Sequence, residues 1–105
     1  GVLLLQTKRH ASDRAALTES ESARLGVIIS GVSRALKACA DAAWPYCFGF
    51  TEAYRHVHLV IVSRYPNAPS KYVRLAITDW PDAPRDGPDE VAHLCRRLRA
   101  FLANP

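Results

Sequence analysis

The chain has 105 residues and a formal net charge of +4; 49% of its residues are hydrophobic and 23% are charged. This length predicts a single domain, residues 1–105, and the composition excludes a chain whose main state is disordered. The basic residues are dispersed, which argues against a nucleic-acid surface, and the opening apolar run is too short to span a bilayer.

The three cysteines, Cys39, Cys47 and Cys95, are widely spaced and form no C-x-x-C pair. This spacing argues against a zinc knuckle and against a thioredoxin-type motif. Reduced thiols in a cytoplasmic protein are the simplest interpretation. The modest positive charge suits a small ligand that carries phosphate.

The first half of the chain predicts one strand and one long helix. The apolar run Val2–Leu5 has the length of a buried strand. Thr18 and Glu21 match a capping box, in which each residue satisfies a backbone N–H at the start of a helix. Apolar residues then recur at helical spacing, which predicts an amphipathic helix that ends before Pro45.

The second half predicts two more strands, Tyr46–Phe50 and His56–Ser63, as an antiparallel pair. Tyr72–Thr78 alternates weakly, and we expect it to be an extended edge segment. The proline-rich stretch 79–88 should be irregular, and a last amphipathic helix should begin near Pro88. This order predicts an α+β fold, with a mainly antiparallel sheet that carries one long central helix and a C-terminal helix on one face.

An H-x-H pair is the most informative motif. Because a strand alternates faces, His56, His58 and Val60 should share one face of the sheet. The apolar residues between them, Val57, Leu59 and Ile61, should then pack beneath a helix. From the residues alone, the pair could be structural and solvated, part of a metal site, or a catalytic or anion-binding site.

Three segments, in order, resemble the histidine triad family. HVHLVIVSR at residues 56–64 resembles its signature, H-x-H-x-H followed by two apolar residues and commonly Pro-Arg. GVLLLQTKRH at residues 1–10 resembles its Gly-x-Leu-Val-x-x-x-Lys-Arg-His segment, and the capped long helix follows as expected. Trp80 and the last helix are similar to the C-terminal region of bacterial members. The resemblance covers essentially the whole chain and implies a histidine-triad-like fold.

The resemblance also implies a chemistry. In this family a histidine attacks the α-phosphate of a nucleotide, and water then cleaves the nucleotidyl-histidine. His58 falls at the position of that nucleophile, and His56 at the first triad position, which organises the strand and the phosphate site. His10 matches a histidine of the phosphate-side network. Arg64 matches the basic residue after the motif and is a candidate phosphate ligand, with a solvent-facing structural arginine as the alternative.

The implied substrate is a purine nucleotide, either a nucleoside phosphoramidate or a nucleoside polyphosphate, and the implied assembly is a homodimer. The resemblance implies no metal and no cofactor.

Two departures from the family pattern keep other functions open. The third triad position is Val60, which offers no hydrogen-bond donor to a phosphate or a leaving group. Relative to the family, the chain starts at the glycine before the first core strand, so the strands that form much of the base and ribose pocket are expected to be missing. A nucleotide- or phosphate-binding module with reduced or lost catalysis is therefore the main alternative. A metal-binding domain built on His56, His58 and His10 ranks last.

Overall fold

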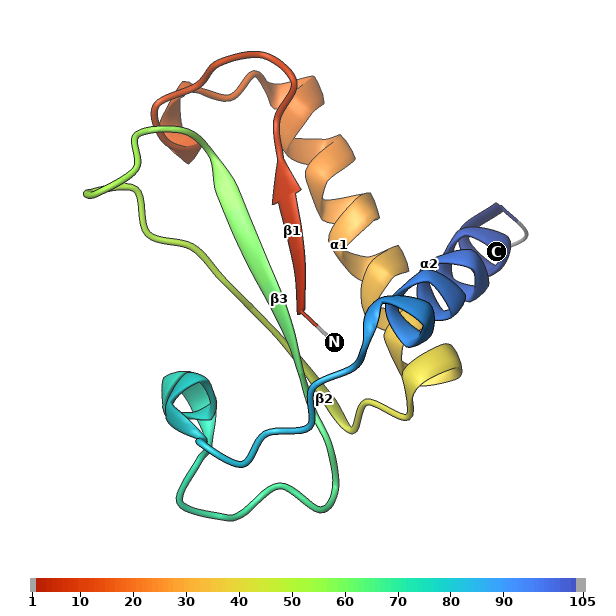
Figure 1. Ribbon diagram of the computed structural model, residues 1–105. Helices are drawn as coiled ribbons and strands as arrows, with labels where there is room; N and C mark the ends of the chain where they lie inside the picture. Colours follow the sequence, from red (N-terminus) through yellow and green to blue (C-terminus); the bar gives the residue numbers. More distant parts are fainter. Residues whose placement is uncertain (1, 104–105) are drawn as a thin grey trace.

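The computed structural model describes residues 2–103 of the chain. Its strands are β1 (Val2–Gln6), β2 (Trp44–Phe48) and β3 (His58–Arg64), and its helices are α1 (Glu19–Ala40) and α2 (Pro88–Ala103). Two short 3₁₀ helices lie at Arg14–Ala16 and Arg74–Asp79. The strands form one antiparallel sheet in the order β1-β3-β2, so β3 is central (Figure 1). This is the α+β architecture that the sequence predicts.

One face of the sheet packs against both long helices (Figure 1). Ile61 of β3 is fully buried among residues of the two helices, including Leu36 of α1 and Leu98 of α2. Leu3 and Leu5 of β1 flank this core. The other face is covered at one end by the chain that follows β3, where Ile77 packs on the sheet.

Helix α1 begins where the sequence predicts. The Thr18 hydroxyl accepts from the Glu21 N–H, and the Glu21 carboxylate accepts from the Thr18 N–H, so the capping box is complete. The helix ends at Ala40 because Asp41 adopts a left-handed conformation, with φ 53° and ψ 29°. The helix therefore stops before Pro45, as predicted.

The two later strands differ from their predicted limits: β2 lies two residues earlier, and β3 starts two residues later and ends one residue later. β2 starts at Trp44 and includes Pro45, which an edge strand tolerates because no second neighbour needs its missing N–H. β3 starts at His58 because the two residues before it bond outside the ladder. The N–H of His56 donates to Tyr54, and the N–H of Val57 donates to Ala11.

The extended edge segment predicted at Tyr72–Thr78 is wrong, because most of it is the 3₁₀ helix Arg74–Asp79. Tyr72, Ile77 and Trp80 all pack against the same face of the sheet. Their spacing of five and three residues cannot place them on one side of a strand, so the chain must turn between them. Within residues 2–103, no helix has the length and apolar character needed to cross a lipid bilayer.

Candidate functional site

His58 is the first residue of the central strand and lies opposite Gln6 of β1. Burial alternates along this part of the chain: Val57, Leu59 and Ile61 are at most 3% exposed, whereas His56, His58 and Val60 are half-buried. The histidines thus face away from the helices. This is the register that the H-x-H pattern predicts.

The orientation of the His58 ring is set by the backbone two residues earlier. Its Nδ1 lies 2.8 Å from the carbonyl oxygen of His56. A carbonyl oxygen only accepts, so Nδ1 carries the proton and donates it. In the neutral ring, Nε2 then holds a lone pair, which is the form that a nucleophile or general base requires.

The His56 ring forms hydrogen bonds through both of its nitrogens. Its Nε2 lies 3.1 Å from the carbonyl oxygen of Thr7 and 3.4 Å from the Thr7 hydroxyl. The Thr7 hydroxyl already donates to the Arg9 carbonyl at 2.8 Å, so the His56 Nε2–H is the donor to both Thr7 oxygens. In a neutral ring, Nδ1 of His56 must then accept. Its partner is Nδ1 of His10 at 3.2 Å, which therefore donates.

The structure thus brings His10, His56 and His58 into one cluster. The ring centroids of His10 and His56 are 5.3 Å apart, and the two rings bond to each other directly. Among residues 2–103, no group of three or more His, Cys, Asp or Glu side chains is placed to hold a metal ion. The hydrogen bonds of the three rings fix their orientation, which is what attack by an imidazole nitrogen requires.

Tyr54 is a member of this cluster that the sequence reasoning missed. Its ring meets the His58 ring edge-on, with centroids 5.2 Å apart and an interplanar angle of 64°. It also lies 6.1 Å from the His56 ring, and it is 54% exposed. The one signal in the sequence is an aromatic residue two positions before the H-x-H pair. Tyr54 forms a partial aromatic wall over both histidines.

An ion pair anchors the loop that carries His10. The guanidinium of Arg9 donates to both carboxylate oxygens of Glu21 at 2.7 and 3.0 Å and also to the Ala16 carbonyl. The Arg9 hydrogen bond, helped by the Thr18 N–H, lowers the pKa of Glu21 to about 2, and the same carboxylate raises the pKa of Arg9. The loop after β1 is thereby tied to the first turn of α1.

Arg64 is not brought to the histidines. It lies six residues beyond His58 on β3, about 20 Å along the strand. It is 8% exposed, and its Nη2 donates to the carbonyls of Ala68 and Pro69 at 3.2 and 3.4 Å. The guanidinium also lies 5.2 Å from the centre of a Trp44 ring. The phosphate-binding role expected for Arg64 stays a prediction, and this geometry favours a structural role that closes the turn after β3.

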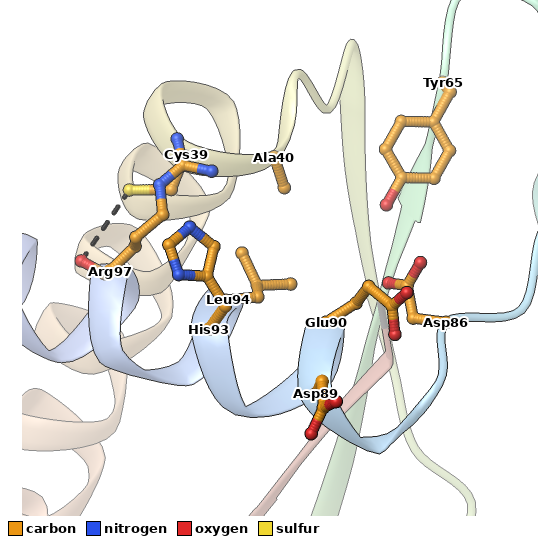
Figure 2. Close-up of a pocket in the computed structure, with 9 residues that line it drawn as sticks. All are labelled: Cys39, Ala40, Tyr65, Asp86, Asp89, Glu90, His93, Leu94 and Arg97. Atoms are coloured by element: carbon orange, nitrogen blue, oxygen red, sulfur yellow. Dashed lines mark hydrogen bonds between the residues drawn. The ribbon is translucent and has the colours of Figure 1, made fainter.

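A separate pocket of about 520 Å³ lies where the end of α1 meets α2 (Figure 2). Its lining includes the carboxylates of Asp86, Asp89 and Glu90, and Figure 2 shows the Tyr65 hydroxyl directed toward Asp86 and Glu90. These carboxylates would repel a phosphate. Since none of the candidate histidines lines this pocket, we place the candidate site at the histidine cluster.

Comparisons with known proteins bear on the fold. No protein-family model and no curated protein matches the chain. The chain is similar to the crystal structure of a histidine triad protein from Bradyrhizobium japonicum, with a TM-score of 0.78 and 24% identity over 96% of this chain and 75% of that one. It is also similar to a hypothetical histidine triad nucleotide-binding protein from Sulfolobus tokodaii, with a TM-score of 0.72 and 16% identity over 98% of this chain and 70% of that one.

The chain therefore has the histidine triad fold, and the resemblance seen in the sequence is confirmed at the level of the fold.

Proposed function

We propose that this protein binds a nucleotide, and that Nε2 of His58 attacks its α-phosphorus to form a nucleotidyl-histidine. The observation that carries the proposal is the 2.8 Å hydrogen bond from His58 Nδ1 to the His56 carbonyl. The fold supports it, since one protein with a similar structure is described as nucleotide-binding. The substrate would be a purine nucleotide in the form of a nucleoside phosphoramidate or a nucleoside polyphosphate.

The hydrogen bond contributes to the reaction as well as to the orientation. As Nε2 bonds to phosphorus, the bond from phosphorus to the amine or phosphate leaving group breaks, and its electron pair departs with that group. The ring becomes positively charged because Nδ1 keeps its proton. A charged donor makes a stronger hydrogen bond than a neutral one, so the His56 carbonyl stabilises the charge as it develops. Water then attacks phosphorus, the P–N bond breaks, and its electron pair returns to Nε2.

Val60 sets the expected rate. It is the next residue on the His58 face, and its side chain cannot donate to a phosphate oxygen or to a leaving group. Loss of one such donor lowers turnover by about 10²- to 10³-fold. The same feature favours a second candidate function, a nucleotide- or phosphate-binding module without catalysis.

The proposal also includes a homodimer and a cytoplasmic location. β1 is an edge strand, and its Val2 and Leu4 are 68% and 58% exposed. An edge of this kind pairs readily with a second chain, which supports a homodimer formed through this edge or through α1. The thiols of Cys39, Cys47 and Cys95 are free, which fits a reducing compartment such as the cytoplasm.

Single-turnover labelling tests the proposal. The protein at high concentration is mixed with adenosine 5′-phosphoramidate at millimolar concentration, and the intact mass is followed after an acid-free quench. We expect an acid-labile adenylyl adduct that His58→Ala abolishes. His93→Ala, which removes an exposed histidine of α2, is the matched control and should label like the parent. Nucleotide binding without any adduct would establish the non-catalytic alternative, and no binding at all would overturn both functions.

A further inference from the structure

A second pocket lies on the same face of the sheet as His58. It encloses about 420 Å³ between β3 and the segment that crosses this face after it. Its walls are mainly apolar and include Val60, Val62, Ile77, Trp80, Ala83 and Pro84. This volume is within the range of small-molecule sites, which are typically apolar with a few polar groups.

Val60 joins this pocket to the histidine cluster. It lines the pocket, and it follows His58 on the same face of β3, about 7 Å along the strand. On the other side of His58 the face is occupied by the rings of His56 and Tyr54. An apolar substituent on a phosphorus held at His58 therefore has a cavity available on the Val60 side.

The pocket is mainly apolar, and its polar lining residues are Ser63, Tyr65, Thr78 and Arg85. Of these, the Thr78 hydroxyl already donates to the Leu75 carbonyl at 2.8 Å. Trp80 is held in place by stacking on Tyr72, with ring centroids 6.4 Å apart. Ribose hydroxyls placed against Val60, Val62 and Ile77 would lack hydrogen-bond partners, so an aryl ring is the better occupant of this part of the pocket.

We propose that this pocket takes the leaving group of the substrate, and that the substrates are nucleoside 5′-phosphate esters of acidic aryl alcohols. The inference rests on the proposed function: it keeps the nucleotide and the attack by His58, and it puts an aryloxide in place of the amine or phosphate leaving group. Nε2 of His58 forms a bond to phosphorus, the bond from phosphorus to the aryl oxygen breaks, and its electron pair leaves on that oxygen as an aryloxide. No proton is required. An alkyl phosphoramidate must instead expel an amine that is protonated as it leaves, and Val60 cannot supply that proton.

Three adenosine donors distinguish the need for the pocket from the need for a proton donor. The 4-nitrophenyl phosphate ester releases an aryloxide that occupies the pocket and needs no proton. The N-butyl phosphoramidate releases an amine that needs a proton. The phosphorofluoridate releases fluoride, which needs neither the pocket nor a proton. We expect the nitrophenyl ester to label His58 at least about 100-fold faster than the butyl phosphoramidate. Val60→His should accelerate labelling by the butyl compound and change labelling by the phosphorofluoridate by less than about threefold.

Ala83→Glu tests the pocket itself, because it places a carboxylate on the pocket wall from a half-buried loop position. We expect about a tenfold rise in the half-saturating concentration of the nitrophenyl ester and no change for the phosphorofluoridate. Should the variant fold poorly, methyl resonances of Ile77 in the parent should still shift on titration with 4-nitrophenyl phosphate.

The outcomes distinguish the two proposals. Labelling of His58 by none of the three donors would overturn the proposed function. Labelling by the phosphorofluoridate, together with equal rates for the aryl and butyl donors or unmoved Ile77 resonances, would overturn the pocket assignment alone.

Discussion

His58 and His56 are joined through the backbone: the His58 Nδ1–H donates to the His56 carbonyl oxygen over 2.8 Å. The backbone just before β3 therefore orients the proposed nucleophile, and the His56 side chain is free to bond elsewhere. Its ring meets Thr7 and His10 instead. The two histidines of the H-x-H pair thus have different roles despite their shared face.

This division predicts unequal effects of substitution. His56→Leu keeps the carbonyl that orients His58, so adduct formation should continue at about a tenth of the parent rate, the cost of losing one or two hydrogen bonds. His10→Ala breaks the same ring-to-ring contact from the other side. The double variant should therefore be no worse than His56→Leu alone, which a double-mutant cycle on the labelling rate measures. Additive losses would mean that His10 acts on the substrate independently of His56.

Arg64→Gln should affect stability and leave chemistry unchanged. The variant removes charged donors to Ala68 and Pro69 from a buried position, so the free energy of unfolding should fall by about 1–3 kcal/mol. Denaturant titration measures this loss. At a temperature where the variant is folded, the half-saturating concentration of nucleotide in the labelling reaction should match that of the parent. A large rise in the half-saturating concentration of nucleotide would show that Arg64 binds phosphate.

Gly49 is required by the close approach of the chain after β2 to the backbone of His58. A Cβ at this position would overlap the His58 carbonyl oxygen and press on the Leu59 side chain. Gly49→Ala should lower the free energy of unfolding by about 1–3 kcal/mol. Gly26→Ala is the matched control: nothing lies near its Cβ position on α1, so that variant should gain about 0.5–1 kcal/mol. Equal stability of the two variants would contradict the packing described at His58.

The Arg9–Glu21 pair predicts a dependence of stability on pH. The pKa of Glu21 falls from 4.5 to about 2 in the folded protein, mainly through the hydrogen bond from Arg9. A lowered folded pKa contributes stability above the unfolded value, and this contribution is lost as pH falls from about 4.5 toward about 2. The stability difference between the parent and Glu21→Gln should therefore shrink over that interval in urea titrations. High salt should weaken the effect, because the pair is solvent-exposed.

Glu19→Gln is the control for this comparison. It removes a carboxylate from the same turn of α1 and leaves the Arg9–Glu21 pair intact. A pH dependence as large for Glu19→Gln as for Glu21→Gln would assign the effect to the helix terminus in general.

Local signals in the sequence predicted the parts of the fold that depend on local chemistry. The capping box of Thr18 and Glu21 and the alternation of Val57, Leu59 and Ile61 each depend on neighbours a few residues apart, and both were confirmed. The helical turn at Arg74–Asp79 was missed because it depends on which side chains the sheet face accepts. A weak alternation over a few residues carries no information about that distant surface.

The candidate site was predictable only in part for the same reason. His56 and His58 are identified by their spacing, and His10 by the resemblance of residues 1–10 to the family segment that ends in Lys-Arg-His. Tyr54 and Thr7 join the cluster through loop conformations that no spacing encodes. The inward position of Arg64 depends on the turn after β3 folding back so that the carbonyls of Ala68 and Pro69 reach its guanidinium.

Attack by Nε2 of His58 is tested by identifying the ring nitrogen that carries the nucleotide. The protein labelled with ¹⁵N at its histidines is trapped as the adenylyl adduct, and ³¹P–¹⁵N coupling with site assignment locates the bond. Since Nδ1 of His58 donates to the His56 carbonyl, we expect the phosphorus bond at Nε2 of His58. A bond at Nδ1 of His58, or at any nitrogen of His10 or His56, would contradict it.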